Sequence, residues 1–161
     1  MNKEQEIKKL KRDWQAMIKV SHDFFHAWRQ MMEEEVDDRR ARFLTERFWE
    51  KIAISNAEMY RGDKTDISKI LRFMARMSDV MGETVTTDSK NGESYLIHIA
   101  CPWIDSFKEY EAKNRCQAGC DCWFETTLKL INPDLKMQTL DCLTEGGKGC
   151  IRKFTNKKKQ E

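Results

Sequence analysis

The sequence predicts a single α+β domain in which amphipathic helices precede and interrupt a four-stranded, mainly antiparallel sheet. Apolar residues recur with a helical period as far as Gly82, the period then changes to two, and two hairpin signals are separated by further helical segments. The 161 residues suit one domain. We expect a helical region over residues 4–82, an α+β region with the cysteine cluster over 83–155, and a flexible tail over 156–161.

The first expected helix covers residues 4–36 and carries a seven-residue apolar repeat. The repeat consists of Ile7, Leu10, Trp14, Met17, Ser21, Phe24, Trp28 and Met31, and it is widened by Ile18, Phe25 and Met32. A helix of some 30 residues is about 45 Å long, which exceeds the width of a compact domain of this size. This seam can pack on the chain's own core, on a second copy, or on both, and we expect a homodimer through the first helix.

His22 and His26 form an H-x3-H pair on the same helix, which is the spacing of two helical metal ligands. On the seven-residue repeat they lie away from the apolar seam. We therefore expect them at a solvated or edge position, unless a second surface covers that face.

Two further helices are expected before the sheet. The first covers residues 38–61 and stops at Gly62. Thr65 or Asp66 caps the next, whose apolar face is Ile67, Ile70, Met74, Met77 and Met81, and Gly82 ends it.

Two hairpins follow, with two helices between them. Residues 83–87 and 94–100 alternate as strands around a turn that contains Asn91-Gly92, a strong hairpin signal. Helices are expected over 104–113 and over 117–131, where Asn132-Pro133 ends the second. The last hairpin pairs residues 135–143 with 150–154 around a turn with three glycines.

Composition limits the classes of partner and compartment. The formal net charge of +2 is too small to indicate nucleic-acid or membrane-surface binding. No segment has the 18 or so apolar residues of a membrane helix, and the N-terminus lacks the apolar core of a signal peptide. We therefore expect a cytoplasmic protein, where six cysteines are ligands, nucleophiles or core residues rather than disulfides.

Cys142 and Cys150 are expected to face each other across the last hairpin. Directly opposite residues have Cβ atoms roughly 4.5–5.5 Å apart, which suits two thiolates on one metal. Cys116 and Cys120 share one face of a helix that continues toward the core, whereas Cys122 lies on another face and is left out. The four converging cysteines predict a metal–thiolate site that holds zinc, or iron in its place. The alternative is that they are small buried apolar residues.

A small-molecule pocket is expected beside this cluster. Cys101 and Trp103 leave the first hairpin there, and His98 and Trp123 complete the expected pocket residues. A Cys101–His98 nucleophilic dyad is disfavoured by strand alternation, unless the strand ends before Cys101.

At these residues the sequence resembles known families. Cys116, the stretch Gly119-Cys120-Asp121-Cys122-Trp123, Asn132-Pro133 and the segment from Cys142 to Cys150 are similar to the 4-vinyl reductase-type domains. They are equally similar to the L-2-amino-thiazoline-4-carboxylic acid hydrolase-like proteins. The similarity covers about residues 80–155.

The resemblance implies a zinc held by a distant cysteine, a glutamate and a closing C-x7-C pair. Cys142 and Cys150 match the closing pair, Cys116 matches the distant cysteine, and Thr139 stands where the glutamate would be. Cys120 is the better substitute for that glutamate, and a water or substrate atom is the other possibility.

Three classes of function remain open. The first is a hydrolase that acts on a small C=N or C–N compound resembling a thiazoline carboxylate, and it is the one we favour. The second is a non-catalytic ligand-binding or sensor domain with a structural zinc. The third is a dimeric interaction module.

Overall fold

The computed structural model describes residues 2–90, 93–112 and 115–156. The helices and strands follow one another as expected, and the α+β fold class is confirmed. The elements are α1 (Lys3–Glu35), α2 (Asp38–Ala57), α3 (Ile67–Val80), β1 (Thr84–Lys90), β2 (Glu93–Ala100), α4 (Pro102–Glu109), α5 (Cys116–Ile131), β3 (Leu135–Asp141), the 3-10 helix η2 (Leu143–Glu145) and β4 (Cys150–Asn156).

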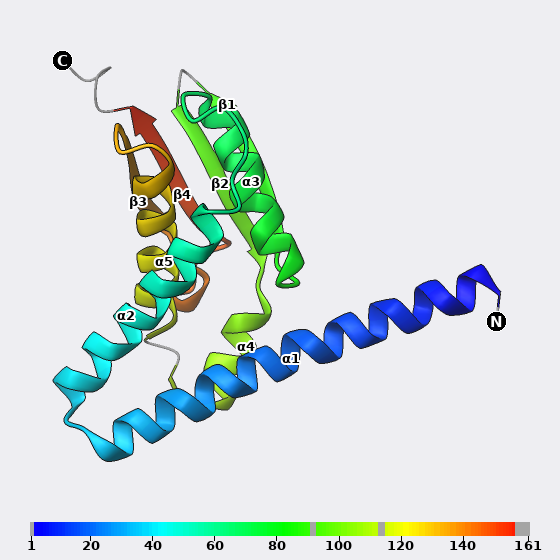
Figure 1. Ribbon diagram of the computed structural model, residues 1–161, viewed down its shortest axis with the longest axis vertical. Coiled ribbons are helices and arrows are strands. Elements are labelled where there is room, and N and C mark those ends of the chain that lie inside the picture. The colour runs from blue at the N-terminus through cyan, green and yellow to red at the C-terminus, as the bar shows by residue number, and fades with distance from the viewer. Residues whose placement is uncertain (1, 91–92, 113–114, 157–161) are drawn as a thin grey trace.

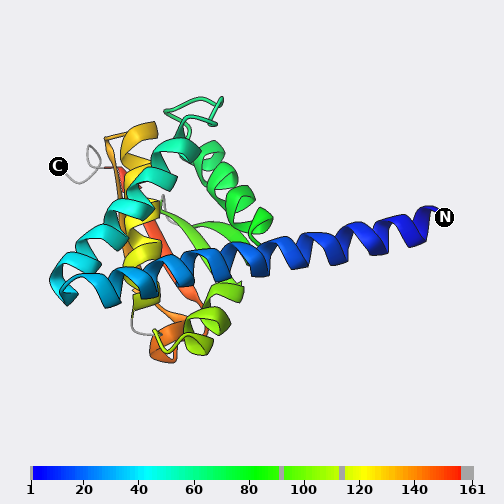
Figure 2. The same cartoon turned by 60° about the horizontal axis from the view of Figure 1, so that its bottom comes forward.

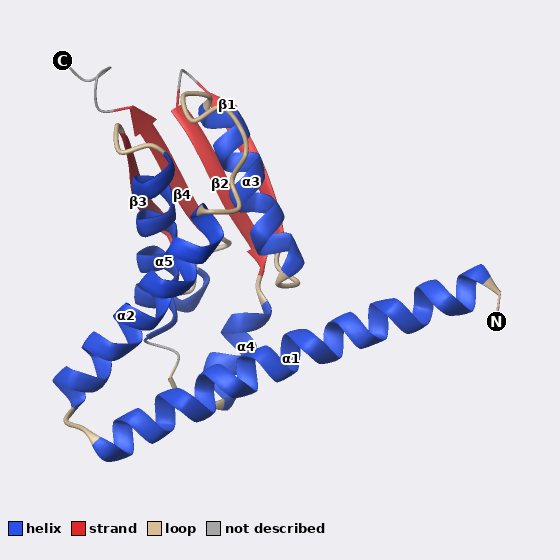
Figure 3. Ribbon diagram, in the orientation of Figure 1, coloured by secondary structure: helices blue, strands red, loops and turns tan. Residues whose placement is uncertain are grey.

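The four strands form one antiparallel sheet in the order β1-β2-β4-β3. Helices α3 and α5 cover one face of this sheet, and α2 packs against α5 (Figures 1 and 3). The expected turn at Asn91-Gly92 and residues 157–161 of the expected tail lie outside the described residues. None of the helices in the described part of the chain combines the length and apolar character that a membrane crossing requires.

Local signals in the sequence explain most of the helix boundaries. The carboxylate of Asp66 accepts hydrogen bonds from the backbone N–H groups of Ser68 and Lys69 and so caps α3. Gly82 adopts a positive φ of 79° directly after that helix, a conformation that favours glycine. Helix α4 begins at Pro102, two residues earlier than expected, because the first turn of a helix needs no N–H from its proline.

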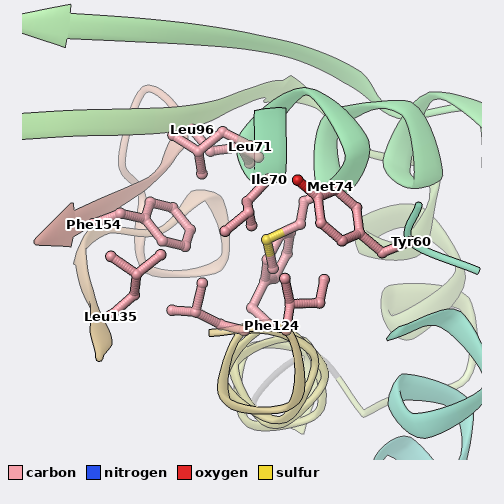
Figure 4. Close-up of a cluster of buried hydrophobic side chains, with 10 residues drawn as sticks. Tyr60, Ile70, Leu71, Met74, Leu96, Phe124, Leu135 and Phe154 are labelled. Carbon is pink, nitrogen blue, oxygen red and sulfur yellow. The ribbon is translucent and has the colours of Figure 1, made fainter. Parts of the chain in front are cut away.

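The main core lies between the sheet and the two helices that cover it (Figure 4). Its fully buried members include Ile70 and Met74 of α3, Phe124 of α5, Leu96 of β2 and Phe154 of β4. On β2 the residues of even number from Ser94 to His98 are buried, so this strand presents them to the helices.

Helix α1 buries a different face from the expected seam. His22 and His26 are 3% and 0% exposed, so the expectation that they are solvated is wrong. They pack on α4, where His22 stacks on Trp103 with ring centroids 3.7 Å apart and His26 bonds to Ser106 at 2.9 Å. Periodicity placed Phe25 and Trp28 on the seam, but Phe25 is buried on the face with the histidines and Trp28 packs beside it. The sequence could not show that α4 covers this face.

The expected seam is largely open to solvent. The exposed apolar side chains of α1, here called the α1 stripe, are Ile7, Leu10, Trp14, Met17, Val20, Phe24 and Met31. Every residue from Asn2 to Met17 is exposed, and this half of the helix extends away from the rest of the molecule (Figure 2).

The two buried histidines predict a stability that depends on pH. Burial lowers the pKa of His22 from 6.5 to about 4, and burial together with Arg29 lowers that of His26 to about 4. The unfolded histidines therefore take up protons at a higher pH than the folded ones. We expect the free energy of unfolding to fall as the pH decreases from about 6.5 toward 5, measured by urea denaturation. His22→Phe keeps an aromatic ring on Trp103 and should flatten this dependence, whereas an unchanged slope would contradict the assignment.

Candidate functional site

A cavity of about 170 Å³ opens between the ends of α3 and β2 and the helices α4 and α5. Its walls are mostly apolar, with aromatic side chains from Trp49, Trp103, Phe107, Trp123 and Phe124. Five of the six cysteines also line it: Cys101, Cys116, Cys120, Cys142 and Cys150. The structure thus gathers the thiols around one apolar space.

Different elements bring each thiol to this cavity. Cys101 lies between β2 and α4, Cys116 and Cys120 lie one turn apart on the inner face of α5, and Cys142 and Cys150 flank the η2 turn. Cys122 lies outside the cavity, where its Sγ bonds to the carbonyl oxygen of Glu46 on α2 at 3.5 Å.

Cys142 and Cys150 have their Sγ atoms 3.7 Å apart. This is far longer than a disulfide bond of about 2.05 Å. It matches the edge of a tetrahedral zinc site, which is about 3.8 Å when Zn–S bonds are about 2.3 Å. The backbone N–H of Leu143 donates to Cys150 Sγ at 3.4 Å, and Thr144 Oγ1 lies 3.0 Å from Cys142 Sγ.

The other expected ligands do not complete a metal site. Cys120 Sγ accepts a hydrogen bond from Arg152 Nη2 at 3.1 Å, and a guanidinium there would repel a cation. Thr139, at the position of the family glutamate, instead donates to Asp121 at 2.8 Å. Among the described residues, no three His, Cys, Asp or Glu side chains are grouped closely enough to hold a metal ion. The separation of Cys142 and Cys150 thus suits two ligands of one metal, whereas Cys120 lies against a guanidinium.

The apolar surroundings keep the thiols protonated. Burial raises the pKa of Cys116 to about 12 and that of Cys150 to about 11, and it also raises the pKa of Cys101 and Cys120. Arg152 opposes this effect at Cys120 without reversing it. Neutral thiols are weak nucleophiles, so burial makes these cysteines unreactive at neutral pH.

Arg152 lines the cavity, and this charged residue is only 1% exposed. Its Nε lies 3.2 Å from Asp121 Oδ1, and its Nη1 lies 3.4 Å from His98 Nδ1. The guanidinium carbon also lies 4.6 Å from the centre of the Phe124 ring. The buried cation is therefore neutralised and joins β4 to both α5 and β2.

These contacts fix the tautomer of His98. Arginine only donates hydrogen bonds, so Nδ1 of His98 must accept and Nε2 must carry the proton. Nε2 lies 2.9 Å from Glu83 Oε2 and 3.1 Å from Ser78 Oγ. His98 thus donates to Glu83 and has no lone pair free toward the cavity.

Unlike His98, Glu83 keeps a hydrogen-bond acceptor atom that is not used by another residue of the described chain. Its side chain lines the cavity and is 10% exposed. Within the described chain, His98 is the only hydrogen-bond or ion-pair partner of its carboxylate, and the contact uses Oε2. Oε1 is therefore free to accept a proton from a bound molecule or water.

The structure places all eight expected site residues on this cavity wall, including Cys101, His98, Trp103 and Trp123. Cys101 reaches the same side as His98 because β2 ends at Ala100, before alternation can turn it away. Sequence reasoning missed Glu83 and Arg152. Arg152 did carry a signal, since it shares an inward strand face with Phe154 and a charge there needs a partner.

Comparisons with known proteins agree with this architecture. A family model described as L-2-amino-thiazoline-4-carboxylic acid hydrolase matches residues 17–154. No curated protein sequence shows a significant match to the chain.

Two solved structures share the fold. Trafficking protein particle complex subunit 3 from Naegleria fowleri, covalently bound to palmitic acid, has a TM-score of 0.58 and 10% identity, over 88% of this chain and 96% of that one. The phenol-responsive sensory domain of the transcription activator PoxR, with phenol, has a TM-score of 0.57 and 16% identity, over 82% and 74%. At such identities the likeness concerns the fold alone.

The central place of Arg152 can be tested by substitution. Arg152→Met should lower the free energy of unfolding by roughly 3 kcal/mol, because Asp121 and His98 lose a buried donor. Lys153→Met, one residue away on the outer face, is the matched control and should change stability little. Equal urea midpoints for the two variants would contradict the assigned role.

Proposed function

The chain belongs to the L-2-amino-thiazoline-4-carboxylic acid hydrolase family, and from this premise we propose that it binds a single-ring organic molecule in the thiol-lined cavity and hydrolyses a C–N bond of that molecule. The observation that carries the proposal is the contact between His98 and Glu83 on the wall of a cavity of this size.

The size and lining of the cavity favour a small cyclic ligand. Its volume of about 170 Å³ is close to that of an engineered cavity of about 150 Å³ that binds benzene. Trp49, Trp103 and Trp123 provide flat apolar surfaces on which one ring can stack. A five- or six-membered heterocycle suits this space.

The chemistry favours water as the nucleophile. The thiols are neutral, whereas Glu83 lines the cavity and the one ion-pair contact of its carboxylate in the described chain uses Oε2. In the proposed reaction water adds across the C=N bond, while Glu83 takes one proton from the water and passes it to the ring nitrogen. Glu83 then takes the proton of the new hydroxyl group and passes it to the same nitrogen as the remaining C–N bond breaks, which leaves a carbonyl group and an amine. His98 holds the carboxylate in place, and Arg152 holds His98 in the tautomer that donates to it.

A non-catalytic ligand-binding or sensor role is the second candidate. It is favoured by the shared fold with the phenol-responsive domain of PoxR. The same cavity would then bind an aromatic compound without changing it.

A metal–thiolate site is a separate part of the proposal. The Sγ–Sγ distance of Cys142 and Cys150 supports these two residues as its anchor, and Cys116 is the nearest candidate for a third ligand because it lines the same cavity. Zinc is the favoured metal and iron the alternative. No step of the proposed reaction uses it.

We also propose that the chain acts as a homodimer. The exposed α1 stripe favours this, because an apolar surface of that length promotes aggregation when it is left uncovered.

The catalytic proposal is tested with Glu83→Gln. Calorimetric titration with L-2-amino-thiazoline-4-carboxylate should give similar affinity for this variant and the unmodified protein. Hydrolysis followed by nuclear magnetic resonance should slow by roughly 10²- to 10⁴-fold, because the proton acceptor is lost. Asp79→Asn, an exposed acid paired with Arg76, is the control and should leave the rate unchanged.

Three outcomes separate the candidates. An unchanged hydrolysis rate in Glu83→Gln would show that Glu83 is not the proton acceptor. Binding of the thiazoline or of phenol without turnover would favour the sensor role. No binding of either compound would refute a single-ring ligand.

The metal proposal is tested by elemental analysis of untagged, reduced protein. We expect about one zinc per chain, and loss of it in Cys142→Ser and in Cys150→Ser. Cys122→Ser is the control, because that thiol faces α2 outside the cavity. Finding iron in place of zinc would support the site and change the identity of its metal, whereas finding no metal would refute the site.

A further inference from the structure

We propose that two copies of this chain pair through α1 in antiparallel orientation, with the basic N-terminal end of one helix beside the acidic C-terminal end of the other. This orientation rests on the homodimer of the proposed function and does not depend on the cavity.

The α1 stripe offers a surface along which a second helix can pack. Leu10, Met17 and Phe24 recur every seven residues and are 63%, 63% and 74% exposed. Seven-residue spacing is the pattern of a helix that packs along a second helix. The opposite face of α1 carries the buried residues His22, Phe25, His26 and Arg29 and lies on the domain. A second helix can therefore lie along the stripe while each domain stays on the outer side.

The N-terminal half of α1 lacks a partner helix in the described part of the chain. The described residues before Trp14 are all exposed, and the first hydrogen bond from α1 to the rest of the described chain is at Trp14, whose Nε1 donates to Val80 O at 2.8 Å. A helical segment this short is marginal in water on its own. A second helix beside it would stabilise it by burying Ile7 and Leu10 (Figure 2).

Charge decides the orientation. Residues 3–13 contain five basic and three acidic side chains, whereas residues 23–35 contain four acidic and one basic. Moreover, Arg29, the basic residue of the second segment, is already paired with Glu33 at 2.5 Å. Antiparallel pairing brings the basic end of each helix to the acidic end of the other and opposes their dipoles. Parallel pairing would place like charges together at both ends.

This geometry also gives a consistent register. A two-fold axis near Lys19 places Ile7 at the level of Met31 of the second copy, and Trp14 at the level of Phe24. The interface is then the same patch on both copies, as in most two-fold dimers. Leu10 then lies at the level of Trp28 of the second copy, and Met17 lies at the level of Ser21.

Association itself is tested first by light scattering. The unmodified protein should have twice the chain mass of 19.1 kDa at micromolar concentration, and Leu10→Glu should be a folded monomer. Ile99→Glu, on the outer face of the sheet where Ile99 is 56% exposed, is the matched control and should stay a dimer. A monomeric unmodified protein would overturn the proposal, whether or not its α1 binds anionic vesicles.

Orientation is tested by charge reversal at the exposed residues Lys3 and Glu35, which lie at the same level in the antiparallel register. Lys3→Glu, or Glu35→Lys, should each weaken the dimer roughly fivefold, because two opposite-charge pairs become like-charge pairs. The chain with both changes should recover the original dimer affinity, because opposite charges again face each other. A parallel dimer would have the same affinity in the unmodified protein and in all three variants, and that result would overturn the antiparallel arrangement. Circular dichroism checks that each variant keeps its helix content.

Discussion

The buried guanidinium of Arg152 is the contact on which the arrangement of the cavity depends. It comes from β4, is held by Asp121 of α5, and donates to His98 of β2. A buried cation is costly unless every donor finds an acceptor, so the three elements must meet in one geometry. That geometry in turn sets the tautomer of His98 and the position of the Glu83 carboxylate.

The low polarity of the cavity decides which of its side chains are reactive. Burial holds the thiols of Cys101, Cys116, Cys120 and Cys150 in their neutral form, although they are the most numerous reactive side chains present. Glu83 differs because it has a donor on one oxygen and open space at the other. A cluster of cysteines in a sequence therefore does not by itself identify the reacting group. The fold is shared with a phenol-responsive domain and with a palmitate-bound trafficking subunit, so the lining of the cavity rather than the architecture must set the chemistry.

Helix α1 serves two surfaces at once. One face, with His22 and His26, packs on α4, while most of the α1 stripe is exposed and, among the described residues, only its Trp14 bonds to the domain, at Val80 O. The N-terminal half of the helix extends beyond the other elements (Figure 2). This division separates the surface available for association from the cavity, so the two can be tested independently.

The sequence by itself determined the order of helices and strands, the hairpin that joins Cys142 to Cys150, and the inner face of α5, because these follow from periodicity and turn residues within short segments. It also determined the family, through residues whose spacing is local. Only the tertiary structure decided which face of α1 is buried, because that depends on α4, some 80 residues away. Only the tertiary structure brought Glu83 to His98 and Arg152 to Cys120. Hydrogen bonds between distant elements leave no period in the sequence, and they decide which atoms donate, which accept and which remain free.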